Sequence, residues 1–270
     1  MVSPVSLVLE DVDVDFPIYQ SSARSLKQIA LQTAVGGRIR RAGQSGRTLV
    51  QALRGIGLAL RPGDRLALIG HNGSGKTTLL RVMAGIYHPT RGHVRVVGHR
   101  AALCDIQVGQ DDEATGYESI LLRGLMMGRS RSEIDERAKD IANFSGLGEY
   151  LHLPIRTYSS GMVLRLYFSI ATSVSTDILL MDEWIASGDA EFAEKANHRL
   201  QSLIDRAHIL VIASHDQSLL SKLCNRAVLL ESGQIVTEGA VETVFAEYTE
   251  RLTSHRPTDS KVAISASSES

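Results

Sequence analysis

The chain has 270 residues, 43% of them hydrophobic, and a formal net charge of −1. This length and composition are typical of a soluble globular protein with a well-buried core, and they leave nucleic acid and membrane surfaces open as partners without requiring either. No uninterrupted apolar run approaches the ~18 residues of a membrane span, and acidic residues follow too soon in MVSPVSLVLEDVDVDF for a signal peptide. The two cysteines, Cys104 and Cys224, lack metal-ligand spacing and are interpreted as buried thiols in a reducing compartment.

Strand and helix patterns alternate along the chain, which predicts an α/β fold. In chain order the patterns predict a strand at 7–16, strands at 56–60 and 65–69, a helix at 76–84 after a glycine-rich loop, a strand at 94–97 and helices from about 117 to 150.

Two short apolar runs follow, DILLMD at 177–182 and HILVIAS at 208–214. Such runs predict strands buried on both faces of a parallel sheet. Residues 227–238 predict a hairpin that turns at Ser232-Gly233. A serine-rich tail, from about 251 to 270, is predicted to be disordered.

The stretch GHNGSGKTT at 70–78 fits the pattern G-x-x-x-x-G-K-[ST] between a predicted strand and a predicted helix. Glycines let successive backbone N–H groups bond phosphate oxygens, and the helix that follows adds its positive end. Because of this setting, phosphate binding is favoured over an ordinary flexible loop. The predicted nucleotide-binding residues are Gly70, His71, Asn72, Gly73, Ser74, Gly75, Lys76, Thr77 and Thr78.

Within this loop, Lys76 is expected to reach the β- and γ-phosphates, and the Thr77 hydroxyl is expected to hold Mg²⁺. The run ILLMDEW ends in Asp182 and Glu183. A carboxylate at Asp182 would hold Mg²⁺ through water, and Glu183 would activate the attacking water. The alternative is a buried strand that ends in solvated acidic residues. The phosphate-binding pattern about a hundred residues upstream makes the catalytic interpretation the favoured one.

His215 follows the next buried strand, in IASHDQSLL. Ligands bind at the carboxyl ends of such strands, so His215 is predicted to reach a γ-phosphate. A purely structural histidine is the alternative.

These three elements, in this order, resemble the ATP-binding subunit of an ABC transporter over roughly residues 8–248. The resemblance implies a P-loop ABC ATPase core with a parallel sheet, an antiparallel β subdomain and a helical subdomain at about 115–172, in a domain spanning 1–250. It also implies ATP and Mg²⁺ as cofactors, and Lys76, Glu183 and His215 as the catalytic residues.

The family signature L-S-G-G-Q corresponds to Tyr158, Ser159, Ser160, Gly161 and Met162. The motif needs a hydroxyl and a close backbone approach at a helix N-terminus, aimed at a γ-phosphate. Ser159 supplies the hydroxyl, Gly161 permits the approach, and Ser160 replaces a glycine. The signature is therefore altered but retains its essential groups.

The resemblance assigns further roles. Asp189 matches the D-loop aspartate, and Phe16 matches the aromatic residue that stacks on adenine, with Tyr19 as second choice and an ordinary core phenylalanine as the alternative. The lid glutamine, a Mg²⁺ ligand, matches Gln107 or Gln110, with Gln107 preferred. Trp184 stands where the family has a small residue.

In the family, two subunits pack head to tail, so that each ATP lies between one P-loop and the partner's signature. The chain is therefore expected to form a homodimer that works with a separate membrane permease, peripherally on the cytoplasmic face of the membrane and without nucleic acid. The variant signature, together with TGYESILLRGLMMG and DEWIASGDAEFAEKA, resembles the branch that exports cell-surface polysaccharides such as O-antigens, capsules, galactans and teichoic acids. An importer, a drug exporter and a nucleotide-sensing scaffold with weak hydrolysis are the alternatives.

The region from about 20 to 50 is basic and lacks acidic residues. RSLKQIALQTAVGGRIRRAGQSGR predicts a short amphipathic helix and a basic loop inserted between two strands of the antiparallel lobe. It is either a solvated surface insertion or a patch that meets anionic lipid or a lipid-diphosphate-linked glycan.

Overall fold

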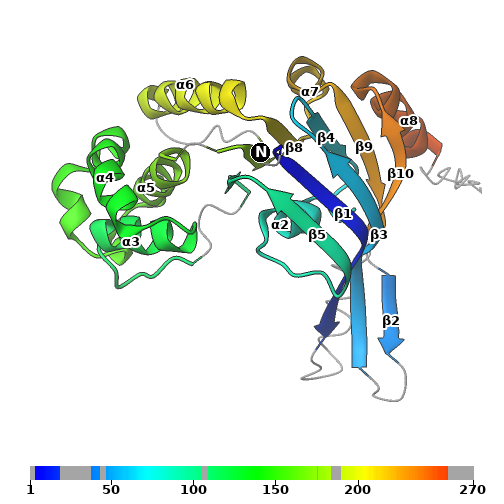
Figure 1. Ribbon diagram of the computed structural model, residues 1–270, viewed down its shortest axis with the longest axis horizontal. Helices are drawn as coiled ribbons and strands as arrows, with labels where there is room; N and C mark the ends of the chain where they lie inside the picture. The colour runs from blue at the N-terminus through cyan, green and yellow to red at the C-terminus, as the bar shows by residue number, and fades with distance from the viewer. Residues whose placement is uncertain are drawn as a thin grey trace, which may run out of the picture.

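The computed structural model describes residues 4–18, 38–42, 47–104, 109–174, 176–183 and 190–254. It shows two sheets beside a separate lobe of helices, as Figure 1 illustrates, and so confirms the predicted α/β class. The amphipathic helix predicted in the basic insertion lies outside the described residues, as do residues 255–270 of the predicted tail.

The smaller sheet is antiparallel and contains four strands in the order β2-β3-β1-β5. Its members are β1 (Ser6–Ile18), β2 (Arg38–Ala42), β3 (Arg47–Leu60) and β5 (Arg91–Val97). Strand β3 begins at Arg47, nine residues before the predicted strand at 56–60, and the outer edge of this extension pairs with β2. Residues 38–42 therefore form a strand. The prediction of a loop there was wrong because it did not consider a strand that pairs along this edge.

The larger sheet has six strands in the order β10-β9-β4-β8-β7-β6. They are β4 (Arg65–Ile69), β6 (Arg100–Ala102), β7 (Ile178–Asp182), β8 (Ile209–Ala213), β9 (Arg226–Glu231) and β10 (Gln234–Gly239). All neighbours pair in parallel except β9 and β10, which form the predicted hairpin.

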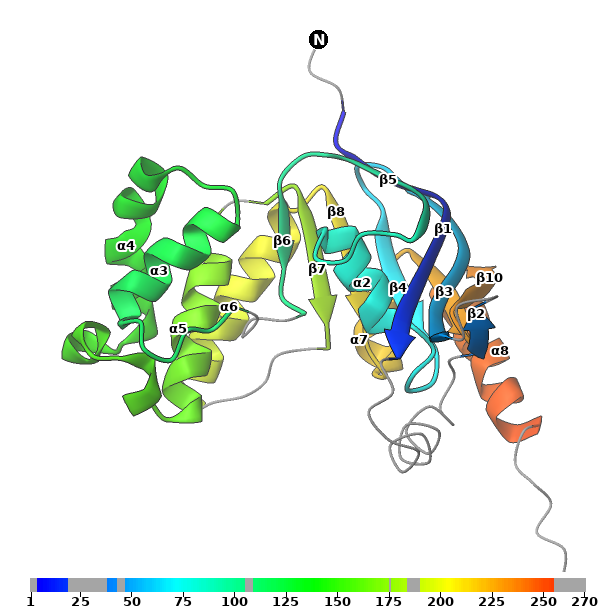
Figure 2. The ribbon, with the colours of Figure 1, turned by 90° about the horizontal axis from the view of Figure 1, so that it is seen from below.

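Both faces of this sheet are buried, as the apolar runs predicted. Along β7 and β8, alternate side chains enter two different core clusters: Leu180 and Val211 pack on one side, and Leu179 and Leu210 on the other. Helix α2 (Lys76–Ala84) lies in the first cluster between the two sheets (Figure 2). Helices α6 (Ala190–Arg206), α7 (Gln217–Leu223) and α8 (Val241–Ser254) cover the other face.

Helix α8 continues to Ser254, so residues 251–254 are helical and the prediction that they belong to a disordered tail was wrong. Two ion pairs explain the extension: the Arg251 guanidinium lies 2.9 Å from Glu231 on β9 and 2.6 Å from Glu247 on α8. Arg251 thereby fastens the last turn of the helix to the sheet.

The helical lobe consists of α3 (Gly116–Met126), α4 (Arg131–Ser145) and α5 (Ser160–Thr172), with short 3-10 turns at Gly148–His152 and Ile155–Thr157. Capping boxes begin α3 and α4, and the lobe has its own apolar core. Phe168 of α5 packs on Phe192 of α6 at 6.0 Å between ring centroids, which joins the lobe to the parallel sheet's helices. Among the helices of the described residues, none combines the length and the apolar content that a bilayer crossing requires.

Candidate active site

Three neighbouring strands bring the predicted catalytic segments to one edge of the sheet. Ala213, the last residue of β8, pairs with Leu68 of β4 on one side and with Asp182 of β7 on the other. The P-loop starts two residues after Leu68, and His215 comes two residues after Ala213. Because these strands are parallel, their carboxyl ends are level, which is where α/β sheets bind ligands.

The P-loop owes its path to its glycines. At Gly70, with φ of 151°, an added Cβ would lie 2.4 Å from the carbonyl oxygen of Leu230. Gly75 has φ of 112° and begins α2 with no side-chain cap, and the first turn of α2 contains no acidic residue. Side chains cap α3, α4, α5 and α7. The uncapped N–H groups of α2 suit an anion.

Lys76 is buried, and its ammonium group lies inside the loop. Its Nζ donates to the carbonyl oxygens of Gly70 at 2.6 Å and of His71 at 3.1 Å. Burial lowers the pKa of Lys76, while the negative charges of Asp182 and Glu183 act in the opposite direction. The loop therefore already holds this cation where phosphate oxygens are expected.

Thr77 and Asp182 meet directly. The Thr77 Oγ1 donates to Asp182 Oδ2 at 2.6 Å, although 105 residues separate them in sequence. A hydroxyl and a carboxylate are hard oxygen donors of the kind that Mg²⁺ prefers, and both are only partly buried. The pair therefore fits the predicted role of holding Mg²⁺ beside the P-loop.

Glu183 is exposed just past the end of β7 and has φ of 64°, which is rare for a residue with a side chain. Its backbone N–H donates to the carbonyl of Ala213 at 2.7 Å, and this bond holds the unusual conformation. Such strain is found where the surrounding structure fixes a functional side chain.

His215 is exposed in the turn between β8 and α7. The turn is held on both sides of it: the Asp216 N–H donates to Ser214 Oγ at 3.1 Å, and Asp216 Oδ1 accepts from Leu219 N at 3.1 Å. The exposed imidazole thus comes from a well-fixed turn at the same edge as Asp182, as predicted.

The structure adds one contact that the sequence did not predict. Gly233, at the tip of the β9–β10 hairpin, donates its N–H to the Ser74 carbonyl at 2.9 Å and accepts from Arg54 N at 2.8 Å. An added Cβ at Gly233 would lie 2.4 Å from the Ala52 carbonyl oxygen. The tip therefore links the P-loop to β3. The turn was recognisable from Ser232-Gly233, but the residues it touches are distant in sequence.

The signature residues lie elsewhere, at the start of α5 in the helical lobe. Ser159 is the N-cap and accepts from Met162 N at 3.2 Å, and Ser159 and Ser160 are exposed. A Cβ at Gly161 would meet no atom closer than Ser159 Oγ at 3.8 Å. Packing within the chain therefore does not require glycine there. An open cavity of about 420 Å³ is lined in part by Ser159, Gly161 and Arg165.

Phe16 is partly buried on β1, and its ring contacts that of Tyr87 edge-on at 5.3 Å between centroids. It also packs against the core cluster around α2. The contact with Tyr87 shows how the Phe16 ring is held. The stacking of this ring on adenine stays a prediction.

Of the remaining predicted residues, only Gln110 lies within the described part of the chain. Asp189, Gln107 and Tyr19 lie outside the described residues, as does Trp184. Gln110, the second choice for the lid glutamine, is exposed and donates from Nε2 to Asp112 Oδ1 at 2.6 Å.

Comparisons with known proteins place the chain in a family and identify solved structures with a similar fold. The profile of the ABC transporter family matches residues 53–186. A solved ATP-binding subunit of an ABC transporter is similar, with a TM-score of 0.62 at 18% identity, over 92% of this chain and 99% of that one. A dimeric ATP-binding cassette bound to ADP and phosphate gives a TM-score of 0.58 at 18% identity, over 87% and 98% of the chains. At this identity the likeness shows the fold alone.

The O-antigen export system ATP-binding protein RfbE of Yersinia enterocolitica is 44% identical over 234 residues, which are 86% of this chain and 97% of that protein. The chain therefore belongs to the ABC transporter family, as its motifs predicted, and is an ABC-type ATPase.

Other relatives confirm the predicted polysaccharide-export branch. RfbB of Myxococcus xanthus, named for the same kind of system, is 38% identical over 76% of this chain and 47% of its own length. The teichoic acids export ATP-binding protein TagH of Levilactobacillus brevis is 39% identical over 74% of this chain and 55% of its own length. The chain thus spans about half the length of these two relatives.

The hairpin contact generates the first prediction. Gly233→Ala should weaken ATP binding about five- to thirtyfold, because the methyl group would push the tip off the Ala52 carbonyl and so off Ser74. Gly239→Ala is the matched control, since its Cβ would meet only Val244 Cγ2 at 3.8 Å. Titration with a fluorescent ATP analogue measures both. Equal affinities in the two variants would show that the tip does not position the P-loop.

Proposed function

We propose that the chain is the ATP-hydrolysing subunit that powers export of a lipid-linked cell-surface polysaccharide through a separate membrane permease. The observation that carries the ATPase part is the Thr77–Asp182 bond beside the P-loop, at the edge where Glu183 and His215 also emerge. The cargo class is supported by relatives named for O-antigen and teichoic acid export, the first of which this chain covers almost completely.

In the proposed reaction, the N–H groups at the start of α2 and the Lys76 ammonium bind the β- and γ-phosphates of ATP. Thr77 and Asp182 would hold Mg²⁺, which would neutralise negative charge on the phosphate oxygens. Glu183 accepts a proton from the attacking water as its oxygen bonds the γ-phosphorus, and the bond from that phosphorus to the bridging oxygen breaks so that ADP leaves. His215 donates a hydrogen bond to the γ-phosphate. Phe16 would stack on adenine, Asp189 would belong to the D-loop, and Gln107 would be a further ligand of Mg²⁺.

A second copy of the chain supplies the rest of the site. The P-loop packs on the β9–β10 hairpin, whereas the signature belongs to the helical lobe with its own core. Ser159, Ser160 and Gly161 would therefore meet an ATP held by another subunit in a two-fold homodimer. The spare room at Gly161 supports this, because a glycine that internal packing does not need suits close approach from outside. Cleavage of the γ-phosphate then releases the two copies.

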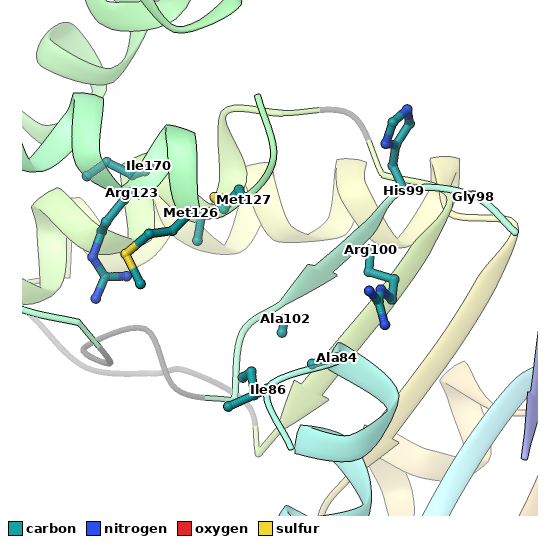
Figure 3. A pocket seen from close by; sticks show the side chains of 11 residues that line it. Ala84, Ile86, Gly98, His99, Arg100, Ala102, Arg123, Met126, Met127 and Ile170 are labelled. Carbon is teal, nitrogen blue, oxygen red and sulfur yellow. The ribbon is translucent and has the colours of Figure 1, made fainter. Parts of the chain in front are cut away.

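The permease would dock in a groove between the helical lobe and the sheet. A cavity of about 340 Å³ lies between α3 and the edge strand β6 (Figure 3). Met126, 66% exposed, and Ile86, 41% exposed, supply apolar surface. Arg100, Arg123 and His99 also line it, and its described lining contains no carboxylate. The surface suits an amphipathic cytoplasmic segment of the permease that carries an acidic side chain. The subunit would then sit on the cytoplasmic face of the membrane.

Glu183→Gln tests the catalytic assignment. The variant should bind ATP and form a stable dimer while hydrolysis falls by a factor on the order of 10²–10⁴, because an amide cannot accept the proton of water. Phosphate release and size-exclusion chromatography with ATP measure the two properties. Unchanged hydrolysis would remove Glu183 from the role of base.

Met126→Asp tests the groove. An aspartate on this face should repel an acidic partner segment and abolish co-purification with the permease, while ATP binding by the isolated subunit stays unchanged. Leu252→Asp on α8 is the control, since Leu252 is an exposed apolar helix residue, 48% accessible, away from the groove. Co-purification that survives Met126→Asp would place the permease on another surface.

The cargo is tested with the subunit and its permease in proteoliposomes. Lipid-linked polysaccharide should stimulate ATP hydrolysis and appear on the opposite side of the bilayer, because transport coupling makes the cycle depend on cargo. Stimulation by a small-molecule substrate or a hydrophobic drug alone would instead favour an importer or a drug exporter. Hydrolysis that no cargo changes would favour a nucleotide-sensing scaffold.

A further inference from the structure

Tyr158, the residue before the signature serine, makes an anchoring contact of its own. Its side chain is half-buried, and its hydroxyl donates to the backbone carbonyl of Tyr150 at 2.5 Å. The two rings also meet edge-on at 6.4 Å between centroids. Burial raises the pKa of Tyr158, so the phenol stays neutral and keeps the proton that it donates.

Gly116, at the start of α3, makes room for this hydroxyl. A Cβ at Gly116 would lie 2.5 Å from Tyr158 Oη and 2.9 Å from the Cα of Leu151. Gly116 is a helical residue without a positive φ, so this close approach explains the glycine better than backbone conformation does. Tyr158 therefore sits in a slot bounded by α3 and by the 3-10 turn that contains Tyr150.

The backbone before Tyr158 is held on its other side. Ile155 N donates to the Ala114 carbonyl, and Arg156 N donates to the Asp112 carbonyl, both at 2.9 Å. The Arg156 guanidinium also lies 3.2 Å from Glu113. Residues 155–158 are thus tied to the segment that leads into α3. Ser159 is the next residue and caps α5, so the position of its hydroxyl depends on how residues 155–158 are held.

We propose that Tyr158 is a positioning residue that fixes the turn at Ser159, so that the signature hydroxyl meets the nucleotide of a second copy in one orientation. The proposal rests on the role given above to the signature. A leucine at this place could pack in the same slot, but only a hydroxyl can bond the Tyr150 carbonyl. The bond restrains a turn that is otherwise exposed, and groups that stabilise a transition state depend on such restraint.

Tyr158→Phe removes the hydroxyl and keeps the ring. We expect kcat for ATP hydrolysis to fall about three- to tenfold, the usual effect of one net hydrogen bond, while KM and ATP affinity of the isolated subunit stay within about twofold. The melting temperature should stay close to that of the unaltered chain. In a Glu183→Gln background, ATP-driven dimerisation should weaken in parallel, which a purely structural role would not cause.

Two further variants sharpen the test. Tyr150→Phe is the matched control, because it removes a phenol of the same pair but leaves the Tyr150 carbonyl that Tyr158 uses. Gly116→Ala keeps the Tyr158 hydroxyl but pushes it off its acceptor, and it should lower kcat as Tyr158→Phe does. Lowered kcat in both Tyr158→Phe and Gly116→Ala, with Tyr150→Phe at the unaltered rate and all three variants melting near the unaltered temperature, would support the proposal.

Ser159→Ala distinguishes the positioning role of Tyr158 from the proposed role of the signature itself. An impaired Ser159→Ala beside unaltered Tyr158→Phe and Gly116→Ala would overturn the positioning role and leave the signature role intact. Equal losses in Tyr158→Phe and Tyr150→Phe would also overturn it, since the ring surface and not the bond would then matter. Unaltered rates in all four variants would overturn the signature role itself.

Discussion

A hydrogen bond from Thr77 Oγ1 to Asp182 Oδ2 joins the start of α2 to the end of β7, and the candidate site depends on it. The bond is possible because β4, β8 and β7 are parallel neighbours whose carboxyl ends are level. A shift of one residue along either pairing would move a core side chain to the opposite face of the sheet, so the buried faces hold the register. The same packing that stabilises the core thus sets the distance between hydroxyl and carboxylate.

In the proposed mechanism, two separate bodies of the chain supply the groups that contact ATP. The P-loop is fixed by the sheet and by the hairpin tip at Gly233, whereas the signature turn is fixed by Tyr158 and the start of α3. Each body has its own apolar core, and α5 and α6 connect them through the contact between Phe168 and Phe192. With the roles proposed above for the P-loop and the signature, such a subunit would present two half-sites on different surfaces, and a second copy would complete each of them.

The contacts around the altered signature explain its residues better than a comparison with L-S-G-G-Q does. Tyr158 occupies a slot that Gly116 leaves open, and Ser159 caps α5 as a serine in an unaltered signature could. The departures from L-S-G-G-Q therefore leave a well-formed helix start with an exposed hydroxyl and room at Gly161. Together with the close relationship to RfbE, this favours a working ATPase over a degenerate one.

The sequence by itself determined the fold class, the helix at 76–84, both buried strands and the hairpin, because these follow from local periodicity and turn chemistry. It also indicated Lys76, Thr77, Asp182 and Glu183 through short motifs, and His215 through its position directly after a buried strand. Strand β2, the last turn of α8, the contact of Gly233 with the P-loop and the slot for Tyr158 were decided only by the tertiary structure. Each of these depends on a partner distant in sequence, and local pattern contains no information about which distant segments will pack together.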